Sequence, residues 1–199
     1  MSKTRLIAAF ASILIALLLA SCATTPPASK RPLQVADPVQ LRNPKAGFAV
    51  KLRADHEPLR IGDYLELNLH TMSGGYMNLY VISSSGQAAQ LLTNYPVRAS
   101  ETVEFPPTTN RKTINNYVLT PPPGLETYML VVTRQPLNLL GRQDIKNIKK
   151  PRTPVAELNM TGPQLVDRLR TVLRRQPPQT WNADSIRLQL APPDVAARS

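Results

Sequence analysis

The chain has 199 residues, with 24 Lys and Arg against 13 Asp and Glu, 20 Pro, two His and one Cys. A single thiol excludes a disulfide framework, and one Cys with two His cannot complete a four-ligand Cys/His zinc site without carboxylates. Proline at about twice its usual frequency argues against a helical bundle and favours extended segments joined by turns. One β-rich domain is therefore the first expectation.

The first 21 residues have the pattern of a signal peptide. Lys3 and Arg5 precede an apolar stretch over residues 6–20, which is too short for a comfortable membrane span. Residues 19–22, Leu-Ala-Ser-Cys, resemble the lipobox of bacterial lipoproteins. The resemblance implies that Cys22 is acylated, with palmitate among its fatty acids, and becomes the first residue of the mature chain. An ordinary secretory signal and a short anchor helix are the alternatives.

Residues 22–45 are predicted to form the lipidated N-terminus and a Pro-rich tether. The segment shows no hydrophobic period that would form a packed element. Pairing of part of it as an edge strand, through Leu33, Val35 or Leu41, is the alternative. Ala23, and not Asp, follows the cysteine, and by resemblance to other lipoproteins this implies residence in the outer membrane on its periplasmic side.

Residues 46–138 are predicted to form an antiparallel β-sandwich of the immunoglobulin-like or transthyretin-like kind. Apolar and polar residues alternate with period two in most of the short strands, and turn residues recur about every ten positions. The run 77–82 is more continuously apolar, which predicts a central strand. The other strands are expected at 48–52, 65–69, 89–92, 101–105, 117–119 and 127–133.

A basic C-terminal extension is predicted over residues 139–199. Apolar residues at 165, 166, 169, 172 and 173 mark one face of an amphipathic helix at about 163–175. Thr161 with Gln164 has the spacing of a capping box, and Pro177 ends the element. A final strand is expected at about 185–190, where Ile186, Leu188 and Leu190 alternate with polar residues.

Four short motifs within residues 46–138 resemble a known family. They are the Gly62-Asp63 strand entry, the Gly75-Tyr76 strand, the glycine turn at 86 and the sequence Pro-Gly-Leu-Glu at 123–126. Together they are similar to a bacterial β-sandwich domain of unknown function that is often attached to protein kinases, caspase-like peptidases or lipoprotein signals. The motifs are mainly structural, so the resemblance implies a fold and no activity.

No set of residues forms a convincing active site. Ser83-Ser84-Ser85-Gly86 follows a strand as a nucleophile elbow does, but it lacks the first glycine and a following helix, which favours a turn. Residues 55–57, Asp-His-Glu, place carboxylates beside a histidine, and the following proline favours a solvated turn. His70 is expected to face solvent. We expect no enzyme activity, no metal site and no cofactor.

Positive charge is concentrated near the C-terminus, where residues 134–199 carry twelve basic and five acidic residues. The chain lacks a nucleic-acid recognition motif or a set of stacking aromatics, so nucleic acid is not the expected partner. An envelope protein or an anionic envelope surface fits the charge better. A solvated face that serves only solubility is the alternative. The candidate binding residues are Lys149, Lys150, Arg168, Arg174 and Arg175.

Two functions follow from these observations. The preferred one is a noncatalytic outer-membrane lipoprotein that faces the periplasm and acts as a protein-interaction module, as accessory parts of secretion or envelope assemblies do by analogy. The alternative is an envelope enzyme or small-ligand receptor with a polar site between the sheets. That site would be lined by Asp55, His56 or Tyr76.

Overall fold

The computed structural model describes residues 41–107, 117–146 and 155–193. Among these residues, no helix has the length and apolar character needed to cross a membrane. The elements in chain order are β1 (Val50–Ala54), β2 (Leu59–Arg60), β3 (Leu67–Thr71), β4 (Gly75–Ile82), β5 (Gln87–Val97), β6 (Thr102–Phe105), β7 (Gly124–Thr133), η2 (Arg142–Asp144), β8 (Ala156–Thr161), α1 (Gly162–Leu173), η3 (Pro178–Thr180) and β9 (Trp181–Ala191).

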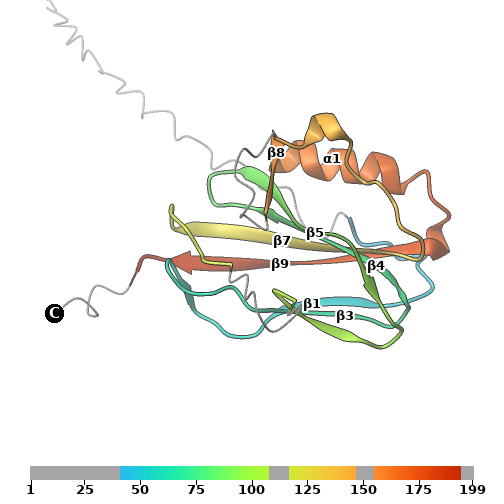
Figure 1. Cartoon of the computed structure of the whole chain (residues 1–199), viewed down its shortest axis with the longest axis horizontal. Helices are drawn as coiled ribbons and strands as arrows, with labels where there is room; N and C mark the ends of the chain where they lie inside the picture. Colours follow the sequence, from blue (N-terminus) through green and yellow to red (C-terminus); the bar gives the residue numbers. More distant parts are fainter. Residues whose placement is uncertain (1–40, 108–116, 147–154, 194–199) are drawn as a thin grey trace, which may run out of the picture. The chain divides into compact units, whose positions relative to one another are not determined.

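The strands form two sheets, and α1 covers the larger one (Figure 1). The small sheet has the order β1-β3-β6, and the large sheet has the order β2-β9-β7-β4-β5-β8. All pairings are antiparallel except that of the two-residue strand β2 with β9. The predicted mainly-β sandwich with one C-terminal helix is confirmed.

The first core fills the space between the sheets. β1 and β3 alternate buried and more exposed residues, which leaves one face of the small sheet in solvent. β4 is buried from Met77 to Ile82, as expected for a central strand covered on both faces. This core includes alternate residues of β3, β4 and β7: Leu67, Leu69, Leu79, Val81, Leu130 and Val132.

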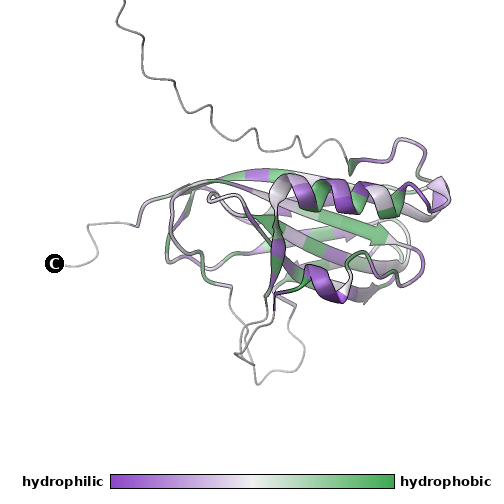
Figure 2. Cartoon of the chain, turned by 90° about the horizontal axis from the view of Figure 1, so that it is seen from above, coloured by the Kyte–Doolittle hydropathy of each residue, from purple (hydrophilic) through white to green (hydrophobic). Residues whose placement is uncertain are grey.

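A second core lies between the large sheet and α1. Leu165, Leu169 and Leu173 of the helix are fully buried and share a cluster with Tyr80 and Met129 of the sheet. Figure 2 looks down on α1 and shows hydrophilic and hydrophobic residues interspersed along it, as its amphipathic pattern predicts. The helix predicted at about 163–175 is therefore present with nearly the same bounds.

The start of α1 is fixed by a cap and by a close contact. The Thr161 N–H donates to Gln164 Oε1 over 2.8 Å, which is one half of the predicted capping box. A Cβ atom at Gly162 would lie 2.5 Å from Ile82 Cγ2. Glycine at this position therefore lets the first turn of the helix approach β4 directly.

The residues after 138 continue the sandwich. β9 is longer than the strand expected at about 185–190, and it lies between β2 and β7 inside the large sheet. β8, at the edge of that sheet, was not predicted. A division at residue 138 therefore does not separate the sandwich from an extension, because the sheet needs strands from both parts.

The chain is already fixed to the domain before residue 45, where the tether was expected to end. Leu41 is buried in the core beneath α1. The Asn43 side-chain amide donates to the carbonyl oxygens of Pro178 and Trp181, over 2.7 and 2.9 Å. These contacts place the entry of the chain beside the C-terminal end of α1. Leu33 and Val35 lie outside the described residues.

Candidate functional site

The predicted binding residues do not form one cluster. Lys149, Lys150 and the lipidation site Cys22 lie outside the described residues. Arg174 and Arg175 directly follow α1 and are exposed, and their side chains make no ion pair with any residue that the structure describes. These two arginines are therefore the predicted residues that are available to an anionic partner.

Arg168 has a structural contact of its own. Its Nη2 atom lies 2.8 Å from Oδ1 of Asp144, whose side chain is only 7% exposed. The other carboxylate oxygen of Asp144 accepts from the Gly141 N–H over 2.8 Å. Arg168 therefore connects the middle of α1 to η2, and we do not include it in the free basic surface predicted from the sequence.

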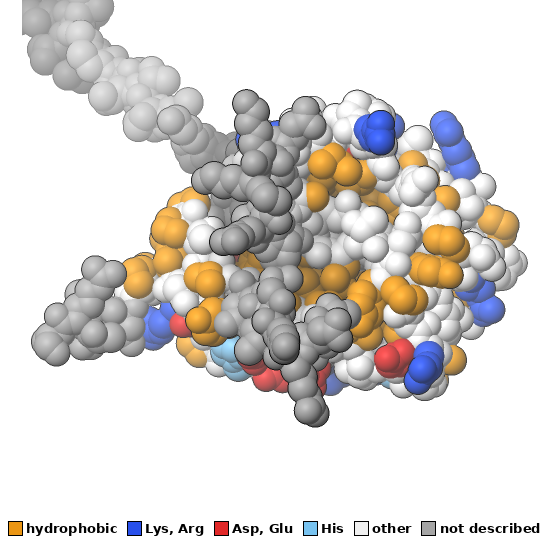
Figure 3. Space-filling view, viewed as in Figure 1, with side chains coloured by type: hydrophobic (Ala, Val, Ile, Leu, Met, Phe, Trp, Pro, Cys, Tyr) orange, Lys and Arg blue, Asp and Glu red, His pale blue; other side chains and the backbone are white. Residues whose placement is uncertain are grey.

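A hollow of about 240 Å³ lies at the C-terminal end of α1 and has strong positive charge. Arg42, Arg170 and Arg174 line it together with Trp181. Arg170 is paired with Asp167 over 2.7 Å, whereas Arg42 and Arg174 have no side-chain ion pair among the described residues. In Figure 3, basic side chains lie along the margin of the molecule where α1 ends and β9 begins.

A second hollow, of about 300 Å³, follows the free edge of β1. Arg42, Lys51 and Arg53 contribute its cations. Two side chains of β9 bind the backbone at this edge: the Leu52 N–H donates to Asp184 Oδ2 over 2.9 Å, and Asn182 Nδ2 donates to the Phe48 carbonyl over 2.7 Å. The edge of the small sheet is therefore partly capped by the large sheet.

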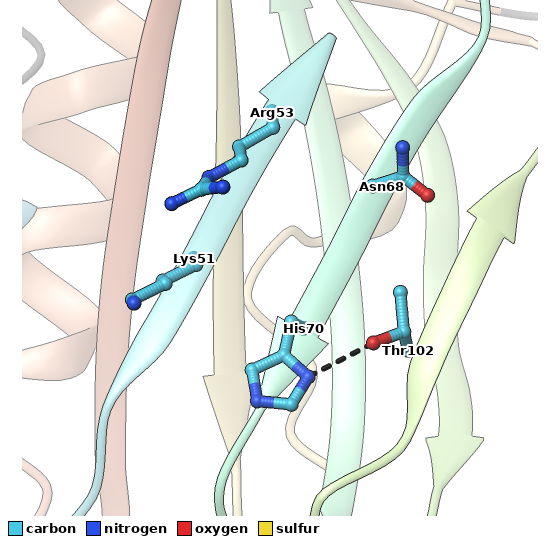
Figure 4. Close-up of a pocket in the computed structure, with 5 residues that line it drawn as sticks. All are labelled: Lys51, Arg53, Asn68, His70 and Thr102. Carbon is cyan, nitrogen blue, oxygen red and sulfur yellow. Dashed lines mark hydrogen bonds between the residues drawn. The ribbon is translucent and has the colours of Figure 1, made fainter. Parts of the chain in front are cut away.

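The third hollow lies on the solvent face of the small sheet and measures about 310 Å³ (Figure 4). Its lining residues occupy neighbouring register positions, with Lys51 opposite His70 and His70 opposite Thr102. His70 Nδ1 and Thr102 Oγ1 are 3.0 Å apart. Arg53 and Asn68 form the next row. His70 is on the solvent-facing side of its strand, as predicted.

Three exposed side chains beyond β1 could hold a cation. The ligand atoms of Asp55, His56 and Glu66 lie within 4.8 Å of one another. One of them is already engaged, since Asp55 Oδ1 accepts from Asn68 Nδ2 over 3.1 Å. Exposed acidic groups of this kind also occur without any metal, so we assign no ion here.

The residues of the alternative polar site are not brought together. Asp55 and His56 precede Leu59, which pairs with Leu190 near the end of β9. Tyr76 pairs with Thr133, which is opposite Trp181 at the start of β9. The two groups therefore lie at opposite ends of the large sheet. The serine-rich segment at 83–86 forms the expected turn, with Gly86 at φ +83° and the Ser83 N–H donating to the Gln87 carbonyl.

A carboxyl group that was not predicted from the sequence lies buried on β7. Glu126 is 6% exposed, and its Oε2 atom accepts a hydrogen bond of 2.5 Å from the Tyr128 hydroxyl. Burial raises the pKa of Glu126, although hydrogen bonds from Tyr128 and the Ser84 backbone partly offset the increase. Burial, together with the nearby Glu126 carboxylate, raises the pKa of Tyr117 to about 12.

We expect Glu126→Gln to stabilise the protein at neutral pH. Between the ordinary value of 4.5 and the raised pKa, the folded state binds more protons than the unfolded chain, so the free energy of unfolding falls as the pH rises. Glutamine removes this ionisation and retains an oxygen that accepts from Tyr128. Thermal unfolding at a series of pH values should show an advantage at pH 7 that disappears toward pH 4. A variant no more stable than the wild type at pH 7 contradicts this.

The described residues thus define a β-sandwich covered by one helix, with a basic surface at one end. Residues 58–136 match the family described as "Domain of unknown function (DUF4384)". This match, which covers less than half of the chain, agrees with the expectation of a domain of unknown function in this region. The match extends from just before β2 to just beyond β7 and does not include β1, β8, α1 or β9. No curated protein and no solved structure matches the chain.

Proposed function

We propose that the protein is a noncatalytic lipoprotein of the outer membrane that faces the periplasm and binds an anionic envelope component. Cys22 carries the lipid, and the basic surface at the end of α1 makes the contact. The lipobox-like sequence and the charge distribution support this proposal. A role as an accessory part of a secretion or envelope assembly is consistent with it.

The observation that carries the proposal is the position of the chain entry. The described chain begins at Leu41, and the adjacent Arg42 lines the same hollow as Arg170 and Arg174. The segment that leads back to Cys22 therefore joins the domain at its basic end. Fully extended, at about 3.6 Å per residue, the eighteen residues from 23 to 40 would span roughly 6.5 nm at most, so a lipid on Cys22 would hold this end within that distance of the membrane.

A small-ligand receptor or an envelope enzyme is the second candidate. The buried Glu126 carboxyl supports it, since a carboxyl group with a raised pKa is a common feature of functional sites. Its contacts with Tyr128 and the Ser84 backbone also suit a purely structural group. We prefer the binding module because its basic residues are accessible.

Replacing the lipidated cysteine tests the anchor. Cys22→Ser should release the protein from the membrane fraction, because the lipid is the proposed anchor and each buried methylene contributes about 0.8 kcal/mol. Fractionation of the envelope and intact-mass measurement of the protein give the result. Membrane-bound wild type with an unmodified Cys22 would contradict the proposal.

Charge reversal at the helix end tests the binding surface. In the unlipidated protein, Arg42→Glu with Arg174→Glu should reduce binding to anionic vesicles by about 30-fold or more at low salt, since each basic residue near such a surface contributes about 1 kcal/mol. Co-sedimentation measures the binding, and added salt should weaken it. The matched control is Arg98→Glu with Arg142→Glu, which makes the same charge change at exposed sites outside the hollow. Equal loss in both variants, or none in either, contradicts the assignment.

A further inference from the structure

Each of the three hollows shares lining residues with a neighbouring one. Lys51 and Arg53 line both the hollow on the solvent face of the small sheet and the hollow along the β1 edge. Arg42 lines both the edge hollow and the hollow at the end of α1. We call the surface over these adjoining hollows the basic groove. Its cations are Arg42, Lys51, Arg53, Arg170 and Arg174.

The charge of the groove is not neutralised by its own acidic residues. Asp184, the acidic residue that lines it, accepts a hydrogen bond from the Leu52 N–H, and Asp167 pairs with Arg170. Lys51 and Arg53 have no ion pair with a described residue. Figure 4 shows that both side chains extend away from β3 and across the free edge of β1. They therefore connect the outer face to the edge.

The course of the groove is unsuited to a flat partner. One end lies beside α1, on one side of the large sheet, and the other end lies on the outer face of the small sheet, on the opposite side. A planar membrane can contact the helix end or the outer face, but it cannot follow the groove between them. A flexible chain can contact every cation along the path.

The β1 edge also disfavours an added peptide strand. Strand addition depends on hydrogen bonds between backbones. Asp184 already accepts from the Leu52 N–H, and Asn182 already donates to the Phe48 carbonyl. An acidic peptide along this edge would need partners for its own N–H and C=O groups, but some of the backbone groups of the edge are already hydrogen-bonded. A phosphate chain has no N–H groups that need such partners. The forked donors of Arg42, Arg53 and Arg174 match phosphate oxygens, whereas Arg170 is already paired with Asp167.

We propose that the basic groove binds a linear phosphate-bearing chain, which wraps from the end of α1 across the β1 edge onto the small sheet. This inference rests on the proposed function for its cellular setting and names the chemistry of the anionic partner. Several weak contacts act together along the groove, because a single exposed ion pair contributes little. Affinity should therefore increase with the length of the ligand and decrease with salt.

Linear polyphosphate is a direct probe for the full chain carrying Cys22→Ser. Trp181 is the only tryptophan and lies in the groove, so its fluorescence reports binding, and calorimetry provides an independent measurement. Long-chain polyphosphate should bind at least tenfold more tightly than tripolyphosphate. Lys51→Glu with Arg53→Glu should remove most of this gain and reduce the slope of log K against log salt by roughly 1 to 2, as expected for two lost phosphate contacts. The double variant Arg98→Glu with Arg142→Glu should bind as the wild type does.

The outcomes separate this inference from the proposed function. Loss of polyphosphate binding but not of vesicle binding in Lys51→Glu with Arg53→Glu supports the groove, because the helix end alone contacts a flat surface. Wild-type polyphosphate affinity in that variant overturns the groove, while the vesicle measurement still tests the proposed function. Tighter binding of a polyglutamate of equal charge overturns the phosphate assignment in favour of an acidic peptide.

Discussion

A chain that ends at residue 138 is expected not to fold, although it includes the whole of the family match. Truncation removes β9, which pairs with β7 from Gly124–Leu190 to Thr133–Trp181 and also carries β2. It also removes α1, which covers the outer side of the large sheet. Circular dichroism should show no cooperative thermal transition in the truncated protein. A chain that ends at residue 193 retains every described element and is the matched control.

The magnitude of the lost burial explains this expectation. Tyr80, Ile82, Met129 and Val131 are at most 2% exposed and belong to the core beneath α1. Burial of one such side chain contributes about 1.5–3 kcal/mol, and a whole domain is stable by only about 5–15 kcal/mol. Exposing all four therefore removes a large part of the total stability, even before the hydrogen bonds of β9 are counted. A cooperative transition in the truncated chain would show that residues 139–199 are dispensable.

The fold could be predicted where the hydrophobic pattern is local. Period-two alternation identified β1 and β3, and the apolar run of β4 identified a central strand, because burial on one or two faces leaves a direct mark on the sequence. The position of β9 within the sheet cannot be predicted from such a local pattern. Its alternation at Ile186, Leu188 and Leu190 predicts a strand but not its neighbours, and a pairing between residues about 60 positions apart is set by the whole sheet.

The binding surface was predictable only in part. The exposure of Arg174 and Arg175 could be predicted from the helix pattern, because the two residues come directly after an amphipathic helix with a buried face. Arg42 is distant in sequence and reaches the same hollow because Asn43 binds the Pro178 and Trp181 carbonyls. The ion pair of Arg168 with Asp144 is equally nonlocal. Spacing along one helix therefore predicts which residues are basic and exposed, but not which of them already have a partner.

Leu79→Ala should lower the free energy of unfolding by about 2–5 kcal/mol, because it removes buried methyl groups and leaves a cavity that the neighbours fill only partly. Leu79 is fully buried in β4, between strands β5 and β7, and belongs to the core between the two sheets. For a protein of this size the melting temperature should fall by roughly 4 to 20 °C.

The matched control is Leu125→Ala, which makes the same change on β7 of the same sheet at a side chain that is 37% exposed. Its effect should remain within about 0.5 kcal/mol, as for most surface substitutions. Equal melting temperatures for the two variants would mean that Leu79 does not face the core. This comparison tests whether Leu79 is buried. The register of β4 needs a separate test, because a shift of one residue would exchange the face toward the small sheet for the face toward α1. Tyr80, the next residue, is also fully buried, so only the identity of the neighbours separates the two registers. Leu130 is opposite Leu79 in β7 and belongs to the same core, so the losses of unfolding free energy from Leu79→Ala and Leu130→Ala should be non-additive in the double variant. Leu169 of α1 belongs to the other core, so the loss from Leu169→Ala should add to that from Leu79→Ala.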